Sequence, residues 1–239
     1  GAKIGGMSSG GQRRGENALF LTYDAYRSGA VGVALSGNVT VDTIVAQGCR
    51  PIGQPTQVTS ANRNMLLSLG GEKPMEVLQR IYDGLPEHDK KLAQQALFLG
   101  LAMDPMNDAP KLGDFLIRNI VGGNSDTGAL SVAEVLKEGQ TVQFHIRDAE
   151  TSAQDLDDML TQYSSRKPIY DETGALLFSC LGRGERLYGL PDHDSEMFRS
   201  KVGSMPLTGF FGNGEIGPVD GSTFLHTYTS SFGIFRPKH

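Results

Sequence analysis

Glycine placement constrains the fold of this chain more than any other feature of its sequence. Of the 239 residues, 31 are glycine, and most of them stand at the ends of short apolar runs. Because glycine adopts positive φ angles without a steric penalty, such positions are typical of turns between short elements. The pattern therefore favours a fold rich in short strands over a bundle of long helices.

Hydrophobic patterning predicts where those strands lie. Residues 40–46 alternate apolar and polar side chains, which is typical of a half-buried strand. Residues 57–69 predict a strand or a hairpin closed by Gly70 and Gly71. Residues 130–136 and 141–147 predict a hairpin that turns at Glu138 and Gly139. Further strands are expected at residues 30–35, 97–101, 115–120 and 175–180, and two glycine-rich strands are expected near the C-terminal end.

Four segments carry helical periodicity instead. Met75, Leu78, Ile81 and Leu85 recur at three- and four-residue steps after Pro74, a residue that suits the first turn of a helix. Because most strands follow one another without a helical crossover, antiparallel pairing is expected. The sequence therefore predicts an α+β fold of largely antiparallel sheets with helices packed on their faces. The other helices are expected at residues 89–95, from a cap at Thr151 or Ser152 through Tyr163, and at 194–202.

An internal echo raises the option of two related half-domains. Glycines at positions 6 and 11 have the same spacing as those at 209 and 214, and each pair is followed by a run with a further glycine. Coincidence in a glycine-rich chain is the alternative. The first residues read like a strand entered partway, so we expect an upstream portion of the N-terminal half to be missing.

Composition excludes several classes of protein. The net charge is −5 and no block of Lys or Arg occurs, which disfavours a nucleic-acid partner. The longest apolar run, residues 96–102, is too short to cross a bilayer, and no signal peptide is visible. Cys49 and Cys180 lack the CxxC spacing of a zinc site, so two reduced thiols and a cytoplasmic location are expected. No cofactor or metal is predicted.

Four strand-like runs end in arginine, at Arg50, Arg118, Arg147 and Arg183. A guanidinium group at a strand end beside glycine can direct its planar fork at a carboxylate or phosphate. The alternative for each is a pair with a neighbouring carboxylate on a solvated rim. We expect at least two of these arginines to converge on one pocket.

The Gly-Asn-Gly-Glu run at residues 212–215 is the densest turn signal in the chain. It allows close backbone approach to a ligand, or it is a plain turn between two strands. Glu215 is the candidate for an ammonium or hydroxyl group. Cys180 and His226 could form a thiol–imidazole pair, although a buried cysteine and a structural histidine are favoured.

Other catalytic patterns fail, so an enzyme is not expected. No P-loop, Gly-x-Ser-x-Gly elbow, His-Glu-x-x-His helix or EF-hand loop occurs. The Asp-His-Asp run at residues 192–194 precedes a predicted helix, where acidic residues are typical caps, and we favour capping over metal binding there.

Several ordered motifs resemble the FIST family. The longest are residues 178–184, 207–218 and 224–229, with residues 48–53, 122–124, 139 and 147–148 in the same order upstream. The resemblance implies the tail of a FIST N-terminal domain over residues 1–60 and a FIST C-terminal domain over residues 61–239.

The resemblance also implies a function. FIST domains are described as sensory, ligand-binding domains of signal-transduction proteins, with amino acids or similar small molecules as proposed ligands and a partner protein for signal output. A scaffold subunit of a larger assembly is the alternative. The family motifs place eight residues of this chain as candidate ligand contacts, namely Cys49, Arg50, Arg147, Cys180, Arg183, Asn213, Glu215 and His226.

Overall fold

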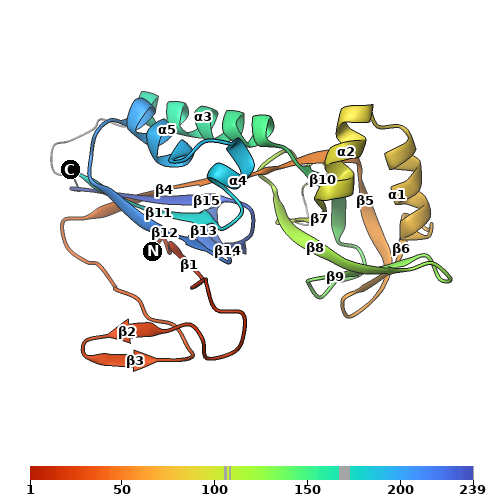
Figure 1. Ribbon diagram of the computed structural model, residues 1–239, viewed down its shortest axis with the longest axis horizontal. Coiled ribbons are helices and arrows are strands. Elements are labelled where there is room, and N and C mark those ends of the chain that lie inside the picture. The colour runs from red at the N-terminus through yellow and green to blue at the C-terminus, as the bar shows by residue number, and fades with distance from the viewer. Residues whose placement is uncertain (105–106, 108, 167–172, 239) are drawn as a thin grey trace. The chain divides into compact units, whose positions relative to one another are not determined.

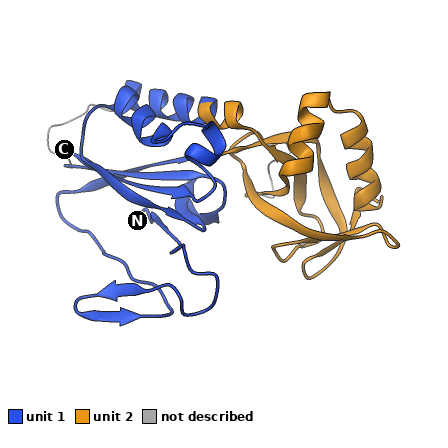
Figure 2. Ribbon diagram, viewed as in Figure 1, with its two compact units in different colours: residues 1–46, 154–239 blue, residues 47–153 orange. Residues whose placement is uncertain are grey.

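Six strands between residues 47 and 153, which we call unit 2, close into a barrel (Figures 1 and 2). The computed structural model describes residues 1–104, 107, 109–166 and 173–238. Each neighbouring pair of barrel strands is antiparallel, in the order β10-β5-β6-β9-β8-β7. The strands are β5 (Cys49–Asn62), β6 (Met65–Leu69), β7 (Leu97–Ala102), β8 (Phe115–Asn124), β9 (Ala129–Val132) and β10 (Thr141–Arg147).

Two helices, α1 (Pro74–Asp83) and α2 (Glu87–Gln95), connect β6 to β7. Val77 of α1 and Ala93 of α2 belong to the buried apolar cluster that fills this unit. The predicted helices at both places are confirmed, and Pro74 stands in the first turn as expected.

The predicted hairpin of residues 57–69 is confirmed by β5 and β6, but the one at 130–147 is wrong. In the barrel β9 lies between β6 and β8, whereas β10 pairs with β5 and β7. The connecting segment carries Leu136 into the core, and the Leu136 N–H donates to the carbonyl of Arg63. The segment is therefore anchored to the β5–β6 turn, which a simple hairpin would not require.

The rest of the chain, residues 1–46 and 154–239, forms unit 1, which contains a four-stranded sheet in the order β12-β11-β15-β4. Its strands are β4 (Thr40–Ala46), β11 (Gly174–Cys180), β12 (Leu207–Gly212) and β15 (Ser230–Arg236). β11 and β12 run parallel, an exception to the antiparallel pairing. The helices α4 (Glu185–Tyr188) and α5 (His193–Val202) supply the crossover that a parallel pair needs.

Helices α3 (Ala149–Arg166) and α5 cover one face of this sheet (Figure 1). Leu156 and Leu160 of α3 and Phe198 of α5 pack against Phe232 and neighbouring apolar residues of the sheet. Phe198 and Phe232 stack at a centroid distance of 5.3 Å. The α+β class, with mostly antiparallel sheets and helices on their faces, is thus confirmed.

A second sheet in unit 1 contains β1 (Gly5–Gly6), β13 (Glu215–Val219) and β14 (Ser222–His226). At Gly217 an added Cβ would lie 2.5 Å from Val45 Cγ2 and 2.7 Å from Ser231 Oγ, so this sheet needs glycine to approach the first one. The two glycine motifs of the echo lie side by side, since the Met7 N–H donates to the Gly214 carbonyl at 2.8 Å. The origin of the echo in two half-domains stays a prediction.

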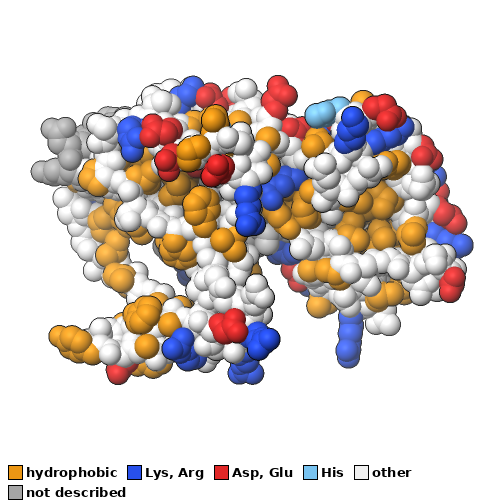
Figure 3. Space-filling model, viewed as in Figure 1, with side chains coloured by type: hydrophobic (Ala, Val, Ile, Leu, Met, Phe, Trp, Pro, Cys, Tyr) orange, Lys and Arg blue, Asp and Glu red, His pale blue; other side chains and the backbone are white. Residues whose placement is uncertain are grey.

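The strand predicted at residues 30–35 is wrong, because that segment is exposed and has no regular structure. A short hairpin of β2 (Leu19–Leu21) and β3 (Asp24–Tyr26) precedes it. Hydrophobic side chains gather on this part of the surface (Figure 3), with Phe20 72% and Tyr23 99% exposed. Two glycine-rich strands were expected near the C-terminal end, whereas the structure has four there, β12 to β15. In the part of the chain that the structure describes, no helix is long and apolar enough to span a membrane.

Candidate functional site

A buried ion pair joins the end of β11 to the start of α5. Arg183 follows β11 and has no exposed side-chain surface, and Asp194 lies in the first turn of α5. Arg183 Nε donates to Asp194 Oδ2 at 2.7 Å, and a second guanidinium nitrogen donates to Oδ1 at 3.2 Å. This fork geometry fixes both groups and closes the loop that carries α4 between them.

Three more side chains complete the coordination of the Asp194 carboxylate. Ser179 and Ser230, on the neighbouring strands β11 and β15, donate their hydroxyls to Oδ2. His193 Nδ1 lies 3.0 Å from Oδ1. Both oxygens of the Asp194 carboxylate therefore accept hydrogen bonds from groups of the protein itself. Through these bonds Asp194 holds the strand ends, the loop and α5 together.

The electrostatics of this network favour the charged form of both ions. Burial alone would raise the pKa of Asp194, but the charge of Arg183 and the hydrogen bonds from His193, Arg183 and Ser230 hold it well below the ordinary value. Burial alone would lower the pKa of Arg183, yet the Asp194 charge raises it. The pair is thus fully ionised at neutral pH.

The loop between Arg183 and Asp194 has a constrained backbone. Gly184 and Gly189 have φ angles of 70° and 71°, and Asp192 has a φ of 56° that a side chain tolerates poorly. The Tyr188 ring stacks on His193 at a centroid distance of 3.5 Å, and the Arg183 guanidinium lies 5.5 Å from the Tyr188 ring centre. These contacts hold the loop in one arrangement above β11 and β12.

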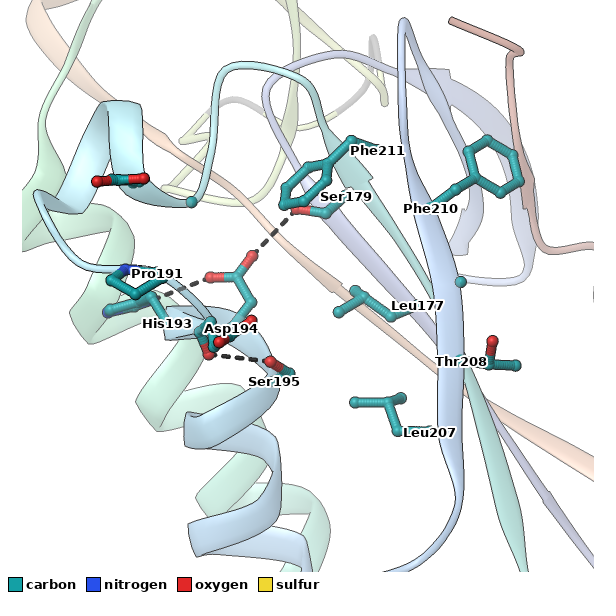
Figure 4. Close-up of a pocket in the computed structure, with 14 residues that line it drawn as sticks. Leu177, Ser179, Pro191, His193, Asp194, Ser195, Leu207, Thr208, Phe210 and Phe211 are labelled. Carbon is teal, nitrogen blue, oxygen red and sulfur yellow. Dashed lines mark hydrogen bonds and ion pairs between the residues drawn. The ribbon is translucent and has the colours of Figure 1, made fainter.

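A pocket of about 410 Å³ lies between this loop and the two strands (Figure 4). Leu177 of β11 and Leu207 and Phe211 of β12 form an apolar wall that also carries Ser179, and Asp194 of α5 faces this wall from the opposite side. Gly209 lies in the same wall, where an added Cβ would meet the Leu177 carbonyl oxygen at 1.7 Å. The remaining lining residues are Gly184, Glu185, Pro191, Asp192, His193, Ser195, Thr208 and Phe210, and the Phe210 ring lies on the other face of the strand, against Phe178.

The residues predicted from sequence are divided between the two units. Cys49, Arg50 and Arg147 belong to unit 2, and the other five belong to unit 1. Arg50 donates to Asp89 at 2.7 Å and to Asp148 at 2.9 Å, so its carboxylate-pairing alternative is the arrangement observed. Burial alone would lower the pKa of Arg50, but these two hydrogen bonds raise it.

Arg147 and Cys49 are partners in the β10–β5 register, and the Cys49 thiol is buried and free of any disulfide. Arg183 reaches the unit 1 pocket through Asp194, although it is not among the residues that line it. The expected convergence of at least two of the arginines at positions 50, 118, 147 and 183 on one pocket stays a prediction.

The remaining four predicted residues lie outside the pocket lining: Glu215 and His226 belong to the second sheet of unit 1, Asn213 precedes it, and Cys180 ends β11 of the first sheet. Glu215 is buried and its Oε2 accepts from Thr229 Oγ1 at 2.9 Å and from the Thr229 N–H. His226 Nε2 lies 3.0 Å from the Gly217 carbonyl, which can only accept, so Nε2 carries the proton. Asn213 is exposed and its backbone N–H donates to the Met7 carbonyl, whereas Cys180 is buried and free of any disulfide.

Sequence reasoning missed most of the pocket. The Asp-His-Asp run was expected to cap the helix, but Asp192 makes no side-chain cap and Asp194 turns to Arg183 instead. The signal that could have found the site is the opposite charge of Arg183 and Asp194 across a short, glycine-bounded loop. The exposed aromatic neighbours Phe210 and Phe211 on one strand were a second signal.

Two family models match consecutive parts of the chain. The FIST N domain matches residues 1–72 and the FIST C domain matches residues 74–218. FIST domains are in general sensory domains of signal transduction. The chain belongs to the FIST family.

Curated relatives support the same assignment. An uncharacterized protein of Mycobacterium bovis is 42% identical over 234 residues, which is 98% of this chain and 60% of the relative. An uncharacterized protein of Mycobacterium tuberculosis is 42% identical over 97% of this chain and 60% of its own length. An F-box/LRR-repeat protein of Arabidopsis thaliana is 25% identical over 75% of this chain and 36% of that protein. The chain spans about three fifths of the mycobacterial relatives.

Proposed function

We propose that this chain is a small-molecule-binding sensory module and that its ligand occupies the unit 1 pocket. The observation that carries the proposal is the position of the pocket, because all of its lining residues fall inside the FIST C match. Its volume of about 410 Å³ lies within the range of about 300–1,000 Å³ that is usual for small-molecule sites.

The chemistry of the lining supports an amino-acid-like ligand. Leu177, Leu207 and Phe211 offer an apolar wall for a side chain, and the opposite side carries fixed polar groups. A few well-placed polar groups beside apolar walls are typical of sites that orient a small molecule. Rigid support from the buried Arg183–Asp194 pair adds to this, since preorganised sites lose less entropy on binding.

The module is proposed to be non-catalytic. The Ser179 hydroxyl is engaged by the Asp194 carboxylate and the Ser230 hydroxyl. The His226 Nε2 proton is donated to a backbone carbonyl. Signal output would then pass through a protein partner, and a cytoplasmic location agrees with two buried cysteines that form no disulfide.

A thermal-shift screen of amino acids and related metabolites tests this function. A ligand at about a hundredfold excess over its Kd should stabilise the protein by about 2.7 kcal/mol. Leu207→Trp, which fills the pocket, should abolish the shift, whereas Leu225→Trp on exposed β14 should retain it. A shift that survives Leu207→Trp, or no shift with any compound, contradicts the proposal.

A scaffold role is the second candidate, and the exposed residues around the β2–β3 hairpin favour it. Phe20, Tyr23 and Val33 are 72%, 99% and 85% exposed, and clustered exposed apolar side chains mark interaction surfaces. Analytical ultracentrifugation should show association that Phe20→Ser/Tyr23→Ser abolishes. A protein that stays monomeric at high concentration, with or without the substitutions, would count against self-assembly through this surface.

A further inference from the structure

Every charged side chain that lines the unit 1 pocket is acidic, apart from the titratable His193. Glu185, Asp192 and Asp194 line it, and neither Lys nor Arg does so among the described residues. The sequence suggested arginines around a ligand carboxylate, yet none of the described lining residues is an arginine, and Arg183 is bound to Asp194. The acidic side chains therefore determine the net charge of the pocket.

Asp194 contributes little to that charge. Its carboxylate is matched by the Arg183 guanidinium and saturated by Ser179, Ser230 and His193. Glu185 and Asp192 differ, because they are exposed and form no salt bridge among the described residues. Two whole negative charges thus remain on the rim.

The N-terminus of α5 acts in the opposite direction. A helix end carries about half a positive charge, which favours anions. Within its first turn α5 also has Glu196, which compensates part of that charge locally. Two rim carboxylates outweigh the remainder, so the potential in the pocket mouth favours a cation.

The walls specify the rest of the ligand. Leu177 and Leu207 are aliphatic, and Phe211 presents a partly exposed ring on the same side of β12 (Figure 4). Aromatic faces attract ammonium groups and also pack against apolar groups. A ligand that matches has a positive head and an apolar body.

We propose that the unit 1 pocket binds a small organic cation, with its ammonium group between Glu185 and Asp192 and its apolar body on Leu177, Leu207 and Phe211. This inference rests on the proposed function, since it names the ligand class of the same pocket. The sequence predicted that arginines bind a carboxylate of the ligand. In this proposal acidic residues of the pocket bind an ammonium group of the ligand instead.

Isothermal titration calorimetry with three probes of similar shape tests the ligand class. The probes are 2-phenylethylamine, L-phenylalanine and 3-phenylpropionate, at pH 7 and one fixed ionic strength. The amine should bind most tightly and the carboxylate most weakly. Glu185→Gln/Asp192→Asn should weaken amine binding about tenfold, because each exposed charge pair changes affinity by about two- to fivefold.

Two controls keep the result specific. Asp24→Asn/Asp220→Asn removes two exposed acids of unit 1 that lie outside the lining, and it should leave amine affinity unchanged. Leu207→Trp should abolish binding of the amine. Amine binding that survives Leu207→Trp, or that is unaffected by Glu185→Gln/Asp192→Asn, overturns the proposal.

The remaining outcomes separate this inference from the proposed function. Tighter binding of 3-phenylpropionate than of the amine, lost in Leu207→Trp, overturns the organic-cation class and keeps the pocket as a ligand site. Absence of binding by all three probes, with a neutral or anionic hit from the thermal-shift screen, has the same meaning. Absence of any ligand in both experiments overturns the inference and the proposed function together.

Discussion

The two units of the molecule bury polar groups in opposite chemical states. Unit 2 buries the neutral imidazole of His145 beside Phe115, and its ion pair between Arg50 and Asp89 stays partly exposed. Unit 1 buries a complete ion pair, Arg183 with Asp194. Burying ions carries a large desolvation cost, so such a pair is weak grounds for stability by itself. The difference indicates that the buried ion pair of unit 1 is present in spite of its desolvation cost because it holds a rigid loop that forms the pocket.

Breaking the buried pair should give the largest effect. Arg183→Met leaves Asp194 charged and buried, and it should reduce the free energy of unfolding by about 3–5 kcal/mol. Urea denaturation measures this loss. The double variant Arg183→Met/Asp194→Leu should recover part of it, because no unpaired charge remains. A loss below about 1 kcal/mol for Arg183→Met would contradict the role given to the pair.

The same pair should set an acid limit for unit 1. The folded-state pKa of Asp194 is held below its ordinary value, so its stabilisation is complete above that ordinary value of 3.8. It is lost as the pH falls from there towards the lower folded-state pKa. Asp194→Asn should flatten the stability profile below pH 3.8, and an unchanged acid limb would contradict the assignment.

Unit 2 should lose stability at a higher pH. Burial lowers the pKa of His145 from 6.5 to about 4, against a smaller opposing effect of its hydrogen bond to the Gln143 carbonyl. The unfolded chain therefore takes up a proton between pH 6.5 and 4 that the folded chain excludes, so stability falls as the pH decreases through this window. The total loss should be about 3 kcal/mol.

His145→Leu removes this titration and should flatten the unfolding free energy between pH 6.5 and 4. Urea titrations at half-unit pH steps check the slope. A variant with the slope of the wild type would show that His145 does not set the window.

The partly exposed pair of unit 2 should matter least. Arg50→Met removes hydrogen bonds to Asp89 and Asp148, but all three side chains contact solvent. The loss in unfolding free energy should be about 1 kcal/mol or less. Ligand binding at the unit 1 pocket should be unaffected, and a large loss of affinity in this variant would revive a role for Arg50 in recognition.

Local signals in the sequence were enough for much of the fold. The helices α1 and α2 were predictable because helical spacing is a property of neighbouring residues, although α2 begins at Glu87 and was expected to begin at Asp89. The barrel was not predictable, since β10 pairs with β5 and β7 and those pairings are distant in the chain. The run at 30–35 shows the converse failure, because an apolar pattern without a partner sheet stays exposed.

The site was harder to predict for the same reason. Arg183, Glu215 and His226 are noticeable in the sequence, yet burial turns them towards Asp194, Thr229 and Gly217. The pocket wall instead comes from ordinary leucines and phenylalanines that only the parallel β11–β12 pair brings together. Residue type indicated chemistry, and tertiary packing decided which residues can meet a ligand.

The most direct test of the unit 1 pocket is a titration of isotope-labelled protein with 2-phenylethylamine followed by amide chemical shifts. The pocket account predicts that the largest shifts map to its lining, with Glu185, Asp192 and Phe210 among them. The amide signals of the barrel residues should keep their original chemical shifts. Shifts centred on Arg50 and Arg147 in unit 2, with the unit 1 lining unperturbed, would contradict it.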